Sequence, residues 1–230
     1  MALKDDLDSE IKKIFRDQWA TRDGSVVPES SDLKFGNDAV KLDGTVLYAD
    51  LSGSTNMVDN YKPEFAAEIY KSYLHCSAKL IRNEGGVITA YDGDRIMGVF
   101  IGDSKNTSAV RCSLRINSAV KNIINPALKV QYPQTNFTVR QVIGIDTSSL
   151  WVARTGVRGA NDLVWVGRAA NYAAKLTGLS ADYPTWITSS VYDKMNKEVK
   201  FSNEKPMWEK RSWTAMNNMT IYRSTSLKDL

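Results

Sequence analysis

A strand, a long helix and a hairpin follow one another in the first half of the chain, and this order restricts the fold most strongly. The stretch "GTVLYADLSG" is a short apolar run rich in β-branched and aromatic residues, which predicts a buried strand. Pro63 opens apolar residues at helical spacing, which predicts a helix over residues 63–84 that a Gly-Gly pair ends. Two strands, Val87–Tyr91 and Arg95–Ile101, then flank Asp92-Gly93, a dipeptide typical of tight hairpins.

The second half continues the alternation of helices and strands. A helix is predicted from Ser104 to Ile124, where Asn125-Pro126 ends the apolar pattern. The stretch "NFTVRQVIGIDTSSLWVARTG" predicts a long hairpin, and "DLVWVGRAANYAAKLTGLS" predicts a strand, a turn and a helix that ends near Gly178. The first six elements form a βαββαβ order, so we expect an α+β, ferredoxin-like core with helices on one face of an antiparallel sheet.

The two ends of the chain add further elements to this core. An apolar stripe predicts an amphipathic helix over residues 3–20, and a polar linker follows it, so residues 1–40 are predicted as a helix and linker and residues 41–230 as the catalytic domain. The C-terminal part predicts a strand, a short helix and a final hairpin. Three aromatic residues there are expected in core or dimer packing: Trp208, Trp213 and Tyr222.

Composition excludes several classes of function. The chain has 30 Lys and Arg against 26 Asp and Glu, a net charge of +4, which does not suggest binding to nucleic acid. No apolar run approaches the roughly 18 residues that cross a bilayer, and the first residues are too charged for a secretory signal, so we expect a soluble, cytoplasmic protein. Cys76 and Cys112 are expected to be reduced core residues, and His75, a lone histidine, excludes a His-rich metal site.

An acid stands at the end of the first core strand. In a βαββαβ arrangement this strand lies beside the central hairpin, so Asp50 and Asp94 at the hairpin tip can be neighbours. Two close carboxylates repel, and a divalent cation held with substrate phosphates resolves the repulsion. The loop "SGST", which comprises Ser52, Gly53, Ser54 and Thr55, offers hydroxyl and N–H groups to those phosphates. Each motif alone is better explained as an ordinary helix cap or hairpin turn, but the motifs together, in this order on these elements, favour a metal–triphosphate site.

From about Gly44 to Leu179 the chain resembles the catalytic domain of class III nucleotidyl cyclases. The resemblance rests on "VLYADLSGST", "GGVITAYDGDRIMGVF", "VIGIDTSSLWVARTG" and "VWVGRAANYAAKL". It implies a head-to-tail homodimer with two composite sites, each holding two divalent cations, Mn²⁺ or Mg²⁺, that assist attack of the ribose 3′-oxygen on the α-phosphate.

The resemblance also assigns residues to roles in that site. It implies Asp50, Asp94 and the Leu51 carbonyl as metal ligands, and Asn171 as the residue that positions the ribose. Four residues further on, Lys175 stands where the family usually carries an arginine that contacts phosphate. An amide and a cation four residues apart share one helix face, although lysine lacks the bidentate fork of arginine.

The expected base contacts depart from those of purine cyclases. Two positions that usually carry polar, base-reading side chains fall here on Ala90 and Val164, which cannot hydrogen-bond through their side chains. Tyr91, Arg168 or Trp165 nearby could fill a smaller pocket that suits a pyrimidine. For Tyr91, an ordinary aromatic strand position is an equally good interpretation.

The whole chain is similar to the pyrimidine cyclases of bacterial Pycsar anti-phage systems. This resemblance implies conversion of UTP to 3′,5′-cyclic UMP and pyrophosphate, and a product that acts on a separate effector protein. It implies no partnership with nucleic acid or membrane. The sequence leaves open a cytidylate cyclase, an adenylate cyclase with an atypical base pocket and an inactive, nucleotide-binding domain.

Overall fold

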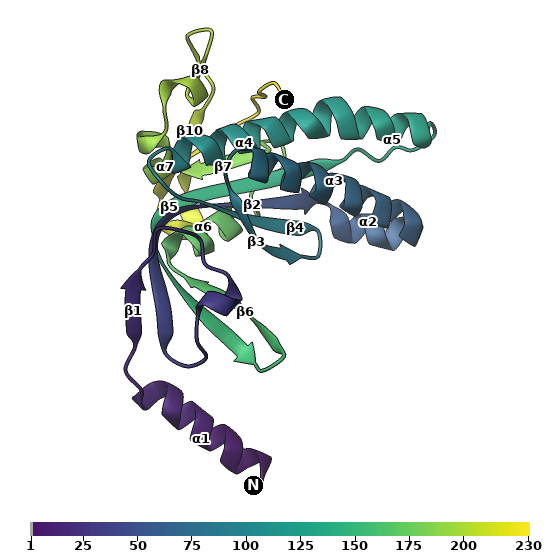
Figure 1. Cartoon of the computed structure of the whole chain (residues 1–230). Helices are drawn as coiled ribbons and strands as arrows, with labels where there is room; N and C mark the ends of the chain where they lie inside the picture. The colour runs from purple at the N-terminus through teal and green to yellow at the C-terminus, as the bar shows by residue number, and fades with distance from the viewer. Residues whose placement is uncertain (1) are drawn as a thin grey trace.

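The computed structural model describes residues 2–230 and centres on one mixed, mainly antiparallel sheet (Figure 1). Its strands follow the order β10-β11-β7-β5-β2-β4-β3, with β1 paired to β2 and β6 paired to β5. The strands are β1 (Ala20–Asp23), β2 (Asp38–Ser52), β3 (Val87–Asp92), β4 (Arg95–Phe100), β5 (Arg140–Val157), β6 (Ala160–Val166), β7 (Thr185–Thr188), β10 (Glu209–Trp213) and β11 (Met219–Ser224). A separate small hairpin is formed by β8 (Phe201–Ser202) and β9 (Lys205–Pro206).

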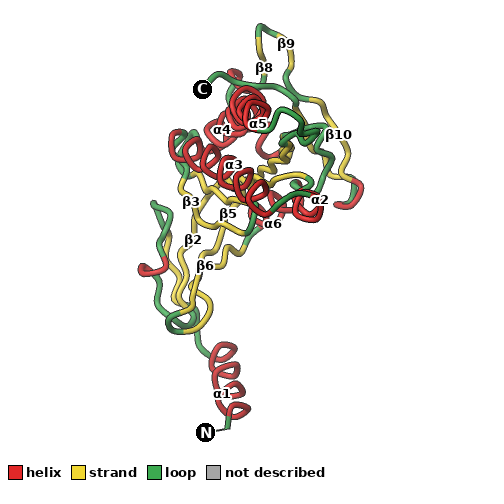
Figure 2. The backbone as a smooth tube through the Cα atoms, turned by 90° about the vertical axis from the view of Figure 1, so that its right-hand side faces the viewer, coloured by secondary structure: helices red, strands yellow, loops and turns green. Residues whose placement is uncertain are grey.

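The helices cover this sheet or extend from it (Figure 2). They are α1 (Leu3–Arg16), α2 (Ser54–Asn60), α3 (Pro63–Asn83), α4 (Lys105–Ala119), α5 (Asn125–Gln131), α6 (Arg168–Leu176) and α7 (Ser189–Lys194). A π-helix, Val120–Ile124, joins α4 to α5, and short 3₁₀ turns span Ser30–Asp32, Lys197–Val199 and Thr214–Met216. Among the described residues, no helix has both the length and the apolar composition needed to cross a membrane.

The predicted ferredoxin-like core is confirmed. β2, α3, β3, β4, α4 and β5 follow one another along the chain, and the four strands lie in the order β5-β2-β4-β3. Both neighbours of β2, namely β4 and β5, run antiparallel to it. Outside this core, α6 packs on the opposite face of the sheet from α3 and α4, so the sheet has helices on both faces.

Three predicted elements differ from the structure. Residues 140–157 form one strand, not a hairpin, and the hairpin that does form joins β5 to β6. The helix that was expected to end at Asn125-Pro126 continues, because the π-helix ahead shifts the hydrogen-bond register and Pro126 lies in the first turn of α5. At the N-terminus, α1 ends at Arg16 instead of residue 20, and β1 turns part of the expected linker into a strand.

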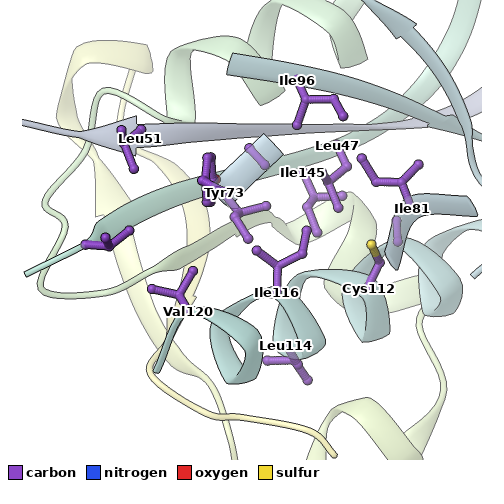
Figure 3. Packing of buried hydrophobic residues seen from close by; sticks show 14 of the residues in the cluster. Leu47, Leu51, Tyr73, Ile81, Ile96, Cys112, Leu114, Ile116, Val120 and Ile145 are labelled. Atoms are coloured by element: carbon purple, nitrogen blue, oxygen red, sulfur yellow. The ribbon is translucent and has the colours of Figure 1, made fainter. Parts of the chain in front are cut away.

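Alternation along β2 sorts its side chains between the two faces of the sheet. One set packs with α3 and α4 in the largest buried cluster and includes Leu47, Ala49 and Leu51 (Figure 3). Tyr73 of α3 and Ile116 of α4 belong to the same cluster. The other set faces α6 and comprises Val46, Tyr48 and, by the period of two, Asp50. The strand therefore carries an acid on its α6 face.

The cysteines, the histidine and the C-terminal aromatic residues lie in different environments. Cys76 and Cys112 are both free thiols, and Cys112 is fully buried whereas Cys76 is partly exposed. His75 lies on the exposed side of α3. Trp208 and Trp213 are buried as expected, and Tyr222 stacks on Tyr192 with ring centroids 3.8 Å apart.

Gly144 of β5 allows α6 to approach the sheet closely. A Cβ atom at this position would lie 2.1 Å from the backbone carbonyl oxygen of Ala173 and 2.7 Å from the Cβ of Leu176. Because the nearest atom belongs to the helix backbone, the clash cannot be relieved by a side-chain rotation. Only a residue without a side chain keeps α6 at this distance.

We therefore expect Gly144→Ala to destabilise the protein by about 1–3 kcal/mol, because overpacking displaces a helix backbone. The thermal midpoint should fall by several degrees, measured by calorimetry. Gly178→Ala is the matched control, since a Cβ there meets only the Lys175 carbonyl oxygen at 3.4 Å. Equal midpoints for Gly144→Ala and the unsubstituted protein would contradict the close approach of α6.

Candidate active site

Asp50 and Asp94 come together at one edge of the sheet. Asp50 pairs with Arg95 across β2 and β4, so it lies beside the tip of the β3–β4 hairpin. Asp92 pairs with Arg95, which leaves Gly93 and Asp94 as the two loop residues, and Gly93 has a φ of 62°. Gly at the first loop position is typical of a type II′ turn, and here it places Asp94 next to the end of β2.

The electrostatics of the two carboxylates show that they interact. Burial and then the negative charge of Asp94 raise the pKa of Asp50 above its ordinary value. Three groups lower the pKa of Asp50, each by a smaller amount: Arg95, the Thr177 hydroxyl and the Leu51 N–H group. The Asp94 Oδ2 atom is buried and has no hydrogen-bond partner among the described residues. The site thus contains two close carboxylates whose charges are incompletely compensated.

This arrangement is suited to a cation that also binds a ligand. Within residues 2–230, no group of three or more His, Cys, Asp or Glu residues is arranged to hold a metal ion. A pair of carboxylates is the ligand set of magnesium sites that complete their coordination with phosphates and water. The unpartnered oxygen of Asp94 and its repulsion with Asp50 fit such an ion.

Two tyrosines of α3 lie near enough to the carboxylates for the negative charges to affect their pKa values, and no pattern in the sequence indicates this. Tyr73 is completely buried, and neither its hydroxyl nor that of nearby Ser77 has a hydrogen-bond partner among residues 2–230. Burial and then Asp50 raise the pKa of Tyr73. Burial and then Asp94 likewise raise the pKa of Tyr70. The spacing i, i+3 places both rings on one helix face, but nothing in the sequence says that this face meets the carboxylates.

Tyr48 and Arg95 are two further residues near the carboxylates. The Arg95 guanidinium lies 5.6 Å from the centroid of the Tyr48 ring and donates to Asp92 at 2.5 Å. Tyr48 shares the sheet face of Asp50, and Arg95 interacts electrostatically with Asp50. The position of Arg95 directly after Asp94 is the sequence signal that could have identified it.

The loop of residues 52–55 joins β2 to α2. Gly53 caps the helix in a left-handed conformation with a φ of 78°, which favours glycine. Gly53 and Thr55 are exposed, whereas Ser52 and Ser54 are partly buried. The loop begins two residues after Asp50, so its polar groups are close to this carboxylate along the chain.

The residues expected around the base lie on both faces of the sheet, with Ala90 and Trp165 packed against the same cluster. Ala90 pairs with Met97 and lies on the Tyr48 face of the sheet, whereas Val164 pairs with Ala153 on the other face. Tyr91 is 57% exposed and lines a surface pocket beside α3.

Arg168 is already engaged in a network at the start of α6. Its guanidinium donates to the Asp146 carboxylate at 3.0 and 3.3 Å, to the Thr147 carbonyl oxygen at 2.9 Å and to the Ser190 hydroxyl at 3.0 Å. Asp146 is completely buried and also accepts from Thr188. This arginine therefore anchors α6 to the strands and to α7.

The nearby Trp165 differs from Arg168 in having an unused donor. Its indole Nε1 atom is buried and has no hydrogen-bond partner among the described residues. The ring packs at the edge of the apolar cluster beneath α6, which includes Val46 and Met97.

Asn171 and Lys175 lie one turn apart on α6, and both side chains are exposed. The Lys175 Nζ atom lies 3.9 Å from the sulfur of Met216. The C-terminal end of α6 approaches the carboxylates, where the Thr177 Oγ1 atom lies 3.3 Å from Asp50 Oδ2. Asn171 is six positions earlier, about 9 Å along the axis. Both side chains are thus accessible to a second molecule.

Comparison with solved structures gives the class of protein. The adenylyl cyclase CyaB of P. aeruginosa is similar with a TM-score of 0.67 and 20% identity, over 84% of this chain and 98% of that chain. The guanylyl cyclase Cya2 is similar with a TM-score of 0.69 and 19% identity, over 82% of this chain and 94% of that chain. The fold is that of class III nucleotide cyclases.

Curated relatives define the family more narrowly. A uridylate cyclase of Xanthomonas perforans is 57% identical over 225 residues, which is 97% of each chain. A uridylate cyclase of Burkholderia cepacia is 52% identical over 227 residues, which is 98% of each chain. No family model matches the sequence. The chain belongs to the family of these uridylate cyclases, and it is a nucleotidyl cyclase.

Proposed function

We propose that this enzyme converts UTP to 3′,5′-cyclic UMP and pyrophosphate. The single observation that carries the cyclase chemistry is the pair of close carboxylates, Asp50 and Asp94, at the sheet edge. The names of the relatives that match nearly the whole chain support UTP as the substrate. The ribose 3′-oxygen forms a bond to the α-phosphorus, the bond from that phosphorus to the pyrophosphate oxygen breaks, and the 3′-hydroxyl proton is released.

Two divalent cations, Mn²⁺ or Mg²⁺, would be held by the carboxylates of Asp50 and Asp94 and by the Leu51 carbonyl. When bound, they would lower the pKa of the 3′-hydroxyl and neutralise the leaving pyrophosphate. The hydroxyl and N–H groups of Ser52, Gly53, Ser54 and Thr55 would donate to the phosphates. The carboxylates also raise the pKa values of Tyr70 and Tyr73, after burial, so both hydroxyls stay protonated near the site.

The remaining groups would come from a second copy of the chain in a head-to-tail homodimer. Asn171 would orient the ribose and Lys175 would contact the phosphates. Their exposure on α6 supports this role, because side chains that face solvent can enter the site of a partner. In an intramolecular displacement, most of the rate acceleration comes from positioning the 3′-oxygen next to the α-phosphorus and from stabilising the charge that develops there.

Several residues are candidates for contacts to the base. Ala90 leaves room for a ring beside the Tyr48 face, and Tyr48 and Arg95 have polar groups on that face. Trp165 has an unused N–H donor. Val164, Tyr91 and Arg168 would need a second copy to bring them to the same base. We propose further that the enzyme acts in the cytoplasm and that cyclic UMP is a second messenger for anti-phage defence, read by a separate effector.

The choice of nucleotide is tested with purified protein, Mn²⁺ and each of ATP, GTP, CTP and UTP in separate reactions. We expect cyclic UMP to be the dominant product, identified by mass spectrometry as the 3′,5′ isomer. Dominant cyclic CMP would reassign the enzyme as a cytidylate cyclase. Dominant cyclic AMP would show that the argument from Ala90 and Val164 is wrong. Nucleotide binding without any product would indicate a binding domain.

A further inference from the structure

The N-terminal helix α1 has an apolar stripe that is exposed along its whole length. None of its 14 residues is buried, and it extends away from the sheet in both views (Figures 1 and 2). Phe15 is 86% exposed and Leu3 is 73% exposed. The stripe consists of Leu3, Leu7, Ile11, Ile14 and Phe15. An isolated helix of this length is marginal in water, so packing of the stripe against a partner is needed to stabilise it.

The base of α1 is nevertheless fixed to the body of the protein. The Asn37 Nδ2 group donates to the carbonyl oxygens of Ile14 at 2.8 Å and Asp17 at 2.6 Å. Trp19 packs edge-on against Trp151 of β5, with ring centroids 5.7 Å apart. Directly after this contact, β1 pairs with β2. The apolar stripe is therefore presented from a fixed position.

The charges of α1 indicate what covers the stripe. The acids lie in the first part of the helix, at Asp5, Asp6, Asp8 and Glu10. Three of the four bases follow them, at Lys12, Lys13 and Arg16, and Lys4 is the fourth, so the helix is neutral. A neutral polar face does not favour an anionic membrane, which attracts helices rich in Lys and Arg. It favours an identical helix in the opposite direction, because Asp5 and Asp6 of one copy then lie level with Lys13 and Lys12 of the other.

We propose that α1 pairs antiparallel with α1 of a second copy of this chain. In this arrangement Leu3 lies beside Phe15 of the other copy, and Leu7 lies beside Ile11. A two-fold axis perpendicular to the helices relates the two copies, which is the symmetry expected for a dimer with identical interfaces. The apolar stripes cover each other, and like charges are level only at Asp8 and Glu10. A parallel pair in register would instead bring every charge beside its own copy.

Disulfide trapping tests the direction of pairing. Leu3→Cys and Phe15→Cys chains are prepared separately in a Cys76→Ser background, since Cys112 is buried and its thiol pKa is raised by burial. After mixing and oxidation with diamide, we expect a covalent dimer that contains one chain of each kind. Leu3→Cys alone should not cross-link, because antiparallel pairing separates the two Leu3 positions by about 18 Å, beyond disulfide reach.

A second pair of variants separates a specific contact from chance collision. Ile11→Glu places a charge in the stripe and should reduce the mixed cross-link at least tenfold. Ser9→Glu places the same charge on the polar face and should leave the cross-link unchanged. Circular dichroism of each variant checks that the protein is folded.

Three outcomes would overturn the proposal. Cross-linking of Leu3→Cys with itself would show parallel pairing, and no cross-link in any mixture would show that the two helices do not meet. Binding of the whole protein to phosphatidylserine vesicles that depends on Ile11, without a cross-link in solution, would identify a membrane as the partner. The readout does not require nucleotide turnover, so its failure is distinguishable from failure of the proposed cyclase activity.

Discussion

Replacing Asp50 by asparagine should lower the rate of cyclic UMP formation by roughly a hundredfold or more. Loss of a metal ligand removes several kcal/mol of charge stabilisation in the transition state, and each 1.36 kcal/mol corresponds to a tenfold change in rate. The measurement is the initial rate with saturating Mn²⁺ and UTP. Asp59→Asn is the matched control, because Asp59 is an exposed acid of α2 and should leave the rate unchanged. Near-normal activity of the Asp50 variant would remove this carboxylate from the mechanism.

Asp50→Asn should lower the rate but raise the stability of the metal-free protein. Burial and the charge of Asp94 raise the pKa of Asp50, so its ionised form is less favourable in the folded protein than in the unfolded chain. At neutral pH without metal, Asp50→Asn is therefore expected to raise the thermal midpoint. Added Mn²⁺ should raise the midpoint of the unsubstituted protein and have little effect on the variant. This difference reports metal binding without any catalytic assay.

Two inactive chains should together restore activity if the sites are shared between copies. Asp50→Ala removes a metal ligand, Asn171→Ala removes the ribose contact, and each variant alone should be inactive. When both are co-expressed, half of the dimers are mixed and one of their two sites is intact, so about a quarter of the normal activity should return. Asp50→Ala mixed with Asp94→Ala is the matched control, since both substitutions damage the same half of the site. Absence of recovery, with mixed dimers demonstrated by differential tags, would contradict a composite site.

The parts of the fold that local chemistry determines could be predicted from the sequence. Pro63 and the Gly-Gly pair define both ends of α3, and the Asp-Gly dipeptide defines the β3–β4 hairpin to within one residue. The continuous length of β5 could not be predicted, because its second half is stabilised by pairing with β6 and with the start of β2. The π-helix before Pro126 was also missed, since proline usually marks a helix end.

Some contacts of the candidate site could likewise be predicted from the sequence, and others could not. Asp50 and Asp94 could be placed together because each follows from a strand end or a hairpin, and topology relates the two. Arg168 engages Asp146, which is 22 residues away in the chain, and no local pattern indicates that partnership. Tyr73 is brought near the carboxylates by the packing of α3 on the sheet, and this packing depends on the whole core. Contacts of this kind require the three-dimensional structure.

β2 runs as one continuous strand between two distant parts of this molecule. It begins directly after Asn37, which anchors α1, and it carries Asp50 near its other end. From Ala39 to Ser52 it pairs with β5 without a bulge, and its 15 residues span about 50 Å. This continuous hydrogen-bonded ladder links the segment next to the anchor of α1 with the segment that carries Asp50.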